Sequence, residues 1–444
     1  MKNGKTFLAV VADEKGEVFE HPFLRMAGMN GMTPCLPRVD ELIPLPEGSR
    51  LFTLPGLPPV GYDPRQNAFA PATRLPRNWG GGTIQAVCAF MAPAYTRTLL
   101  PAADYGGKQM TLPLWAYTAV GWCVEEERFY VAAARVDRNT QWQPRHFDDR
   151  KLDPLVRRRL AEQPGNRLLE QLARCAIDYH CFAAKNLFFG RWEAPLPTSP
   201  VCNSSCLGCL SLQPEASECC PSSQERIAFV PTVEEIRGVA VPHLEQAQHA
   251  IVSFGQGCEG DPILQAERIG EAVRHMRRET ARGTIHLNTN GSLPDAVAAL
   301  ADAGLDSIRI SLNSVRPALY EAYHRPRGYG FADVIESLRR AKAGGLFTMI
   351  NYLVFPGVSD QPEEIEALVR LVDKLDVDLV QLRNLSIDPQ LYWQAMGEPG
   401  PGLGMKAMMD QVKQRVPRLQ YGYFNRTRET FYPPGFEQDW PLGA

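Results

Sequence analysis

Residues 284–313 read TIHLNTNGSLPDAVAALADAGLDSIRISLN, which divides into a strand-like run, a helix-like run and a second strand-like run. Thr284 to Thr289 and Ser307 to Leu312 have the length and β-branched content of strands, and Leu293 to Ala303 has the length of a helix. Antiparallel strands can be joined by a tight turn, but parallel neighbours need a crossover. The order strand, helix, strand therefore predicts two parallel strands joined by a right-handed crossover.

The same alternation runs through most of the chain after Pro195. The expected strands are Leu196 to Val201, Ala250 to Gly255, Thr284 to Thr289, Ser307 to Leu312, Phe347 to Phe355 and Leu379 to Leu382. The expected helices are Val233 to Gln246, Pro262 to Glu279, Leu293 to Ala303, Phe331 to Ala343, Glu363 to Leu375 and, after the last strand, Gly402 to Val416. Pro197 and Pro200 lack a backbone N–H, so the first strand is expected at an edge of the sheet. These units predict an α/β fold over residues 195–390, a partial (βα)6 TIM-like barrel with its chemistry at the carboxyl ends of the strands.

The chain before this barrel has a different texture. Residues 1–111 are crowded with proline and glycine and contain short apolar bursts, which indicates short strands and long loops. Leu114 to Val124 and Arg128 to Val136 are separated by three acidic residues and predict a hairpin, and residues 153–189 show a helical period. We therefore expect residues 1–194 to form a smaller α+β domain that binds substrate or serves as an accessory. Residues 391–444 are expected to form a helix and tail that cover the barrel.

Composition excludes several classes of protein. The chain has 444 residues, of which 44% are hydrophobic and 22% charged, and its formal net charge is −3. It contains no uninterrupted apolar run of about 18 residues, so we expect no membrane span. The near-balance of charge makes a nucleic-acid partner unlikely on electrostatic grounds. Eleven cysteines, an odd number and mostly scattered, are typical of a reducing, cytoplasmic setting.

Three cysteines stand together directly after the first expected strand, in Cys202-Asn-Ser-Ser-Cys206-Leu-Gly-Cys209. A structural zinc site uses four ligands, and an ordinary iron–sulfur cluster uses four cysteines. Three thiolates on a four-iron cube would leave one iron with an open position for a small molecule. The alternative is a non-enzymatic zinc protein with a distant fourth ligand such as His180 or Cys219.

This spacing, placed at the start of a six-unit βα array, resembles the radical S-adenosylmethionine (SAM) superfamily. The resemblance implies a [4Fe-4S] cluster held by Cys202, Cys206 and Cys209, whose fourth iron binds the amino and carboxylate groups of SAM. It also implies reductive cleavage of SAM to methionine and a 5′-deoxyadenosyl radical, which abstracts a hydrogen atom from a substrate. The cofactors supply that reactivity, and the protein supplies placement and exclusion of water.

Further motifs carry the same resemblance at the ends of later strands. Gly257-Cys258-Glu259-Gly260-Asp261-Pro262 is similar to the family's glycine-glycine-glutamate-proline segment, although Glu259 replaces a glycine and Asp261 replaces the glutamate. Asn288-Thr289-Asn290-Gly291 is similar to the family's threonine-asparagine-glycine turn. Gly208 is a third departure, because an aromatic residue is usual before the last cysteine. The residues that the resemblance assigns to SAM are Gly260, Asp261, Pro262, Asn288, Asn290, Ser311, Asn313 and Val354.

Two residues are candidates for direct participation in catalysis. Cys258 is expected at the mouth of the barrel, where it could donate a hydrogen atom or touch the substrate, although a small buried thiol is the competing interpretation. Arg383, at the end of the sixth strand, is expected to face the substrate or the SAM carboxylate, or to form a salt bridge. Cys219 and Cys220 could join Cys175 and Cys181 around a second cluster.

The sequence leaves several functions open. The first hypothesis is a radical SAM enzyme that acts on a peptide or protein, since short strands with open edges suit binding of an extended chain. A small metabolite or an RNA base is the alternative substrate, and an activase that places a radical on a partner's glycine is a third. The resemblance also implies an electron donor such as flavodoxin or ferredoxin.

Overall fold

The N-terminal part of the chain forms antiparallel sheets. In this computed structural model, residues 4–107, 115–213, 222, 224–398, 400–435 and 440–442 are described. The strands here are β1 (Phe7–Ala12), β2 (Val18–Arg25), β3 (Gly28–Asn30), β4 (Thr33–Cys35), β5 (Leu42–Pro44), β6 (Arg50–Thr53), β7 (Val60–Asp63), β8 (Ala68–Pro71), β9 (Gln85–Phe90), β10 (Tyr95–Arg97), β11 (Leu100–Pro101), β12 (Tyr117–Thr118), β13 (Val120–Cys123) and β14 (Arg128–Arg135). They build an 11-stranded sheet and a three-stranded sheet, β11-β3-β4. The main path of the larger sheet is β10-β14-β13-β1-β2-β7-β8, and β5, β6, β9 and β12 pair beside this path. The expected hairpin is confirmed, because β13 and β14 pair antiparallel with Cys123 opposite Arg128; Leu114 lies outside the described residues.

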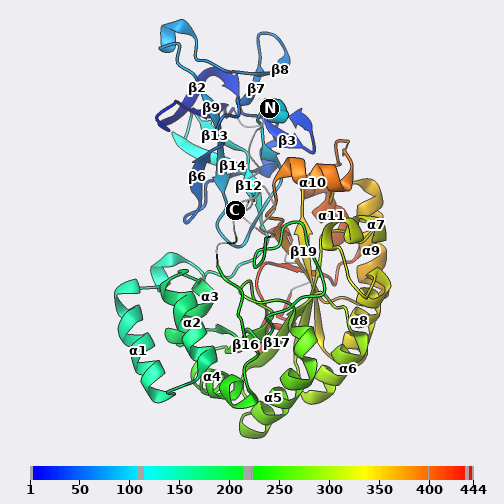
Figure 1. The fold of residues 1–444 in the computed structure, drawn as a ribbon. Coiled ribbons are helices and arrows are strands. Elements are labelled where there is room, and N and C mark those ends of the chain that lie inside the picture. Colours follow the sequence, from blue (N-terminus) through cyan, green and yellow to red (C-terminus); the bar gives the residue numbers. More distant parts are fainter. Residues whose placement is uncertain are drawn as a thin grey trace.

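The second part is a parallel sheet wrapped by helices. Its strands are β15 (Glu193–Pro195), β16 (Ile251–Phe254), β17 (Thr284–Thr289), β18 (Ser307–Leu312), β19 (Phe347–Val354), β20 (Leu379–Asn384) and β21 (Gln420–Gly422), adjacent in that order. Its helices are α4 (Val233–Gln246), α5 (Ala266–Glu279), α6 (Pro294–Ala303), α7 (Pro317–His324), α8 (Phe331–Ala343), α9 (Pro362–Lys374), α10 (Pro389–Met396) and α11 (Met405–Arg415). Figure 1 shows these helices around the parallel sheet and the N-terminal strands at one end of the molecule. The predicted α/β barrel class is confirmed.

Short helices complete the chain. Three α-helices precede the barrel: α1 (Leu152–Glu162), α2 (Arg167–Ile177) and α3 (Phe182–Phe188). The 3-10 helices are η1 (Val39–Glu41), η2 (Arg77–Trp79), η3 (Tyr105–Gly107), η4 (Pro144–His146), η5 (Asp149–Lys151), η6 (Pro262–Gln265) and η7 (Arg428–Thr430). Among the described residues, no helix combines the length and the apolar character that a membrane crossing requires.

The unit at residues 284–313 shows why the sequence folds this way. Helix α6 begins with Pro294 in its first turn, where the missing N–H costs nothing, and ends at Gly304, whose φ of 108° lies in the left-handed region. Side chains alternate along the flanking strands. Ile285 and Leu287 pack into the core shared with the helices, whereas His286 bonds to Ser307 on the opposite face, inside the barrel.

Two strands differ from the expectation. The first strand is Glu193–Pro195 and pairs parallel with β16, so its placement at Leu196 to Val201 was wrong. The segment that follows cannot extend the ladder, because Pro197 and Pro200 lack N–H groups and the Thr198 and Ser199 N–H groups donate to Glu259. The C-terminal segment adds a seventh parallel strand, β21, beside β20.

The two parts of the chain share cores. Helices α1, α2 and α3 contribute Leu152, Leu168 and Leu187 to the hydrophobic core that contains the barrel strands. A second cluster joins the N-terminal sheets to the carboxyl end of the barrel and includes Trp115 and Phe355. These contacts place helices α1 to α3 with the barrel, while the domain limits 1–194, 195–390 and 391–444 stay a prediction.

Candidate active site

The three cysteines of the motif lie on the loop that follows β15. Burial raises the pKa of the Cys206 thiol well above its ordinary value, and negative charge on Cys209 and Cys202 raises it further. Burial likewise raises the pKa of Cys202. Negative charge on Cys209 raises the pKa of both Cys202 and Cys206, so the Cys209 sulfur lies near the other two. A bound cationic group would offset this cost, because thiolate is the form that binds metal.

The described residues do not complete a single-ion site around the three cysteines. Within the described ranges, no group of three or more His, Cys, Asp or Glu side chains is placed to hold a single metal ion. A zinc site brings every sulfur to about 2.3 Å from one point, whereas the irons of a cube occupy separate corners. Of the alternative fourth ligands, His180 is exposed after α2 and Cys219 lies outside the described residues.

Side chains from other elements contact the cysteine sulfurs. His324 Nδ1 lies 3.3 Å from Cys206 Sγ, and its ring stacks on Tyr320 with the centroids 4.3 Å apart. Arg226 Nη2 lies 3.8 Å from Cys209 Sγ and supplies positive charge to this end of the loop. Such contacts orient ligands and stabilise thiolates.

A close approach of two backbones holds the start of the loop in place. Gly260 N–H donates to Ser199 O over 2.6 Å, and Asp261 N–H donates to Val201 O over 2.9 Å. A Cβ atom at Gly260 would lie 1.9 Å from Val201 O, which leaves room only for glycine. Pro262 is buried at the start of η6, for which Asp261 forms the N-terminal cap. The motif at residues 257–262 therefore meets the start of the cysteine loop, while its contact with SAM stays a prediction.

The third strand joins the same network through polar side chains. Asp261 accepts from Thr289 Oγ1 at 2.6 Å and from Asn290 N at 2.7 Å. Asn290 Nδ2 donates to Asn203 Oδ1 at 2.7 Å and to Ser204 Oγ at 3.0 Å, and both acceptors lie between Cys202 and Cys206. Asp261 and Asn290 are thus brought together with the cysteine loop.

Glu259, the first departure from the family motif, is buried and accepts hydrogen bonds from two separate backbone segments. Its Oε2 accepts from Thr198 N at 2.7 Å and Ser199 N at 3.0 Å, and its Oε1 accepts from Gly255 N at 2.7 Å and Gln256 N at 2.9 Å. Burial raises its pKa to about 7. The carboxylate ties the exit of β15 to the exit of β16 and so positions the start of the cysteine loop.

The other departures have neighbours that explain them. A Cβ atom at Gly208 would lie 3.0 Å from both the Tyr323 hydroxyl and Ser386 O, so the space that an aromatic residue would need is already filled. Asp261, one methylene shorter than glutamate, reaches the turn at Thr289 and Asn290 directly.

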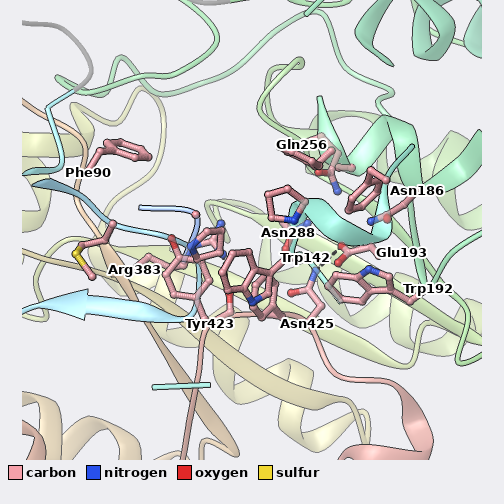
Figure 2. Close-up of a pocket in the computed structure, with 18 of the residues that line it drawn as sticks. Phe90, Trp142, Asn186, Trp192, Glu193, Gln256, Asn288, Arg383, Tyr423 and Asn425 are labelled. Carbon is pink, nitrogen blue, oxygen red and sulfur yellow. Dashed lines mark hydrogen bonds between the residues drawn. The ribbon is translucent and has the colours of Figure 1, made fainter. Parts of the chain in front are cut away.

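A cavity of about 560 Å³ lies between the barrel interior, the N-terminal sheet and α3. Figure 2 shows Asn288, Arg383, Glu193 and Asn425 around it. Arg383 Nη1 donates to Tyr423 O at 2.6 Å, and its guanidinium lies 4.2 Å from the centroid of the Tyr423 ring. Asn288 Nδ2 donates to Phe254 O at 2.8 Å.

Other predicted residues lie away from this cavity. Cys258, expected at the mouth of the barrel, is buried in the core beside Cys175 on α2, and contact with that thiol and burial raise its pKa well above the ordinary value. The Val354 side chain is fully buried in the same core. Cys219 and Cys220 of the suggested second cluster lie outside the described residues.

Ser311 and Asn313 already have protein partners. Ser311 Oγ accepts from Asn351 Nδ2 at 3.0 Å. Asn313 is fully buried, and its Nδ2 donates to the Tyr392 hydroxyl at 3.1 Å, while its Oδ1 has no hydrogen-bond partner among the described residues. That acceptor and the hydrogen of the Ser311 hydroxyl, which only accepts in this bond, are the groups of this pair that could meet a ligand.

The sequence interpretation missed the polar lining of the barrel interior. Arg309 Nη1 on β18 donates at 2.5 Å to Gln381 Oε1 on β20, past the intervening strand β19. Glu193 Oε1 accepts from Ser253 Oγ at 2.5 Å and from Asn425 Nδ2 at 2.8 Å. The available signal was the period of two along the strands, which alternates apolar residues with Arg309 and Ser311 on β18.

Comparisons with known proteins agree with this geometry. Residues 196–372 match the family model of the radical SAM superfamily. The FeMo cofactor biosynthesis protein NifB of Klebsiella pneumoniae is 25% identical over 230 residues, covering 49% of this chain and 45% of that protein. A GTP 3',8-cyclase of Streptomyces coelicolor is 30% identical over 140 residues, covering 31% of this chain and 40% of that protein.

Solved structures give a more distant likeness. The crystal structure of methylornithine synthase (PylB) aligns with a TM-score of 0.37 at 17% identity, covering 61% of this chain and 77% of that one. The chain spans about half the length of the NifB proteins it matches. The radical SAM family uses a [4Fe-4S] cluster and SAM, and the family match begins just before the cysteine loop. Residues 196–372 of this chain therefore form a radical SAM domain.

Proposed function

We propose that this protein is a radical SAM enzyme that generates a 5′-deoxyadenosyl radical and uses it to abstract a hydrogen atom from a substrate. One observation carries the proposal: the loop of Cys202, Cys206 and Cys209 is locked against Gly260, Asp261 and Asn290 at the carboxyl end of the parallel sheet. When bound, the cluster and SAM supply the radical chemistry.

The chain's own residues hold and shield that chemistry. Cys202, Cys206 and Cys209 are the proposed cluster ligands, with the Arg226 guanidinium beside Cys209 and the His324 ring beside Cys206. The N-terminal sheets cover the carboxyl end of the barrel through the cluster around Trp115 and Phe355, which excludes water from that end.

The cavity favours a small substrate over a peptide. Its volume of about 560 Å³ falls in the range of sites for small molecules. The name of one relative, GTP 3',8-cyclase, denotes action on a nucleotide, and this supports a small-molecule substrate here. A peptide or protein, the first hypothesis from the sequence, stays as the second candidate, because β6 and β8 each pair on one side only among the described strands.

The cellular setting and electron supply are also proposals. Each cysteine that the structure describes is a free thiol, which supports a reducing cytoplasm. A flavodoxin or ferredoxin would deliver the electron to the cluster.

Iron loading and SAM cleavage test the function directly. The protein is purified and reconstituted without oxygen, then assayed for iron, sulfide and, with SAM and dithionite, 5′-deoxyadenosine. We expect about four irons per chain and deoxyadenosine formation. Cys206→Ala removes one ligand and should abolish both, whereas Cys35→Ala, on β4 and outside the motif, should retain both. A colourless protein holding one zinc per chain would instead establish the zinc-binding alternative.

A further inference from the structure

The geometry points to a small substrate that carries an anionic group, a carboxylate or a phosphate, held in the cavity by Arg309 and Arg383. This inference rests on the proposed function, since it names the class of substrate for the same site. The cavity is the one lined by these two arginines, Glu193, Asn186, Trp192 and the aromatic residues described below.

The two arginines face one interior without an acidic partner. Arg309 lies on β18 and Arg383 on β20, the two neighbours of β19 in the sheet. Their hydrogen bonds go to neutral acceptors, Gln381 Oε1 and Tyr423 O. In the part of the chain that the structure describes, neither forms an ion pair within 4 Å. Burial, and then the positive charge of Arg383, lowers the pKa of Arg309 to about 9, while the nearby Glu193 carboxylate, which forms no ion pair with Arg309, acts in the opposite direction.

Positive charge exceeds negative charge around the cavity. Arg50, at the rim, is a third arginine in its lining, and Glu193 is the single carboxylate among the described lining residues. Oε1 of Glu193 is already engaged by Ser253 and Asn425. Two guanidinium groups in a partly buried site repel each other, and an anion between them would remove that cost.

Three buried polar atoms of the lining also have no partner. These are Arg309 Nε, Trp192 Nε1 and Asn186 Oδ1, within the described structure. Leaving a buried polar atom without a hydrogen bond costs about 1–3 kcal/mol. Two of the atoms are donors and one is an acceptor; all three are covered by neighbouring protein atoms, so they lie behind the cavity wall and are not assigned to the ligand.

The remaining walls suit a flat or apolar body. Trp142 and Phe147 precede the barrel, Phe182 begins α3, and Phe52 and Phe90 come from the N-terminal sheet. Aromatic walls with a few polar groups at one end are the usual composition of small-molecule sites. Figure 2 shows Phe90 across the cavity from Trp192 and Asn186, so N-terminal and barrel residues enclose the same space.

Titration calorimetry on the full-length, anaerobically purified protein tests the inference without SAM turnover. The probes are phenylphosphate, benzoate and the neutral benzamide, which share one ring and differ in their polar group. We expect one of the anions to bind at least tenfold more tightly than benzamide, and added NaCl to weaken only the anion. Phenylphosphate and benzoate distinguish a phosphate-bearing substrate from a carboxylate.

Variants connect that preference to the two arginines. Arg383→Gln and Arg309→Gln should each weaken anion binding about tenfold or more and leave benzamide binding unchanged. Arg278→Gln, on the exposed face of α5, is the matched control and should change neither. Circular dichroism checks folding. Arg383→Gln, which loses a hydrogen bond to a backbone carbonyl, serves if Arg309→Gln does not fold.

The outcomes separate this inference from the proposed function. Equal binding of the three probes, no binding of either anion, or anion binding that survives both substitutions would overturn it. Tight binding of a peptide with no preference for anions would also overturn it. Any of these results is compatible with deoxyadenosine formation, and anion binding by a protein that cannot cleave SAM would leave the inference standing while removing the proposed function.

Discussion

Asn425 Nδ2 donates a 2.8 Å hydrogen bond to Glu193 Oε1, and this bond joins the two open edges of the parallel sheet. Glu193 begins β15 at one edge, and Asn425 follows β21 at the other. Beside them the rings of Trp192 and Phe424 meet edge to face, with centroids 5.6 Å apart. Edge strands can touch in this way only if the sheet curls into a barrel.

Asn425→Ala tests how much this closure contributes to stability. The substitution removes the bond to Glu193 and the acceptor of the 3.1 Å bond from Gln381 Nε2. We expect the free energy of unfolding in urea to fall by about 2 kcal/mol, since two buried hydrogen bonds are lost. Gln414→Ala, on the exposed side of α11, should change it by no more than about 0.5 kcal/mol. Equal effects of the two substitutions would show that Asn425 does not stabilise the barrel.

Glu259→Gln tests the hydrogen bonds by which this side chain joins the segments that follow β15 and β16. The amide nitrogen would face two backbone N–H donors that now bind a carboxylate oxygen, so buried donors would lose their acceptor. We expect a loss of about 3 kcal/mol in unfolding free energy and impaired iron incorporation. Glu271→Gln, exposed on α5, is the control and should retain both properties. A stable Glu259→Gln protein with a full complement of iron would contradict the role assigned to this carboxylate.

The sequence predicted most of the fold because local patterns determine it. Thr284–Thr289 and Ser307–Leu312 form the strands expected from their composition, and the helix between them differs from the expectation by one residue. The two errors have physical reasons. β15 is only three residues long, and the segment after it bonds to a side chain 60 residues away. β21, also three residues, has no period of its own and is defined by pairing with β20.

The residues of the candidate site were also predicted only in part from the sequence. Gly260, Asp261 and Asn290 were predicted from motifs of a few residues, and the network that joins them to the cysteine loop follows the order of the strands. Arg309 and Glu193 could not be assigned from the sequence, because their partners lie 72 and 232 residues away and become neighbours only when the barrel forms. Cys258 belongs to a segment that the motif identified, but its thiol turns to α2 instead of the cavity.

Gly260→Ala tests the contact between the cysteine loop and the second strand. A methyl group there would lie 1.9 Å from Val201 O, a backbone atom that cannot move without shifting the neighbouring Cys202. We expect a loss of about 3 kcal/mol in unfolding free energy, and loss of most bound iron. Gly257→Ala is the matched control, because its methyl group would meet only the flexible end of Gln224 at 3.1 Å. If the two variants bind iron equally well, the close approach at Gly260 is not needed for the cluster site.

His286 should make stability depend on pH. Its ring lies inside the barrel, with Nδ1 2.8 Å from Ser307 Oγ and Nε2 2.8 Å from Asn288 Oδ1. Burial, and then the positive charge of Arg309, lowers its pKa from 6.5 to about 3. Between pH 6.5 and pH 3, therefore, His286 binds a proton in the unfolded chain but stays neutral in the folded chain. Stability that is present above pH 6.5 is lost as the pH falls toward 3.

The expected pH dependence of the unfolding free energy follows from the lowered pKa of His286. Between pH 7 and pH 5 the native protein should lose about 2 kcal/mol more unfolding free energy than His286→Gln, which has no titrating group at this position. Urea unfolding of both proteins at the two pH values measures the difference, and comparing the pair cancels the contribution of His243, whose pKa burial lowers to about 4. If the two proteins lose the same amount, the folded barrel does not keep the His286 ring neutral at pH 5.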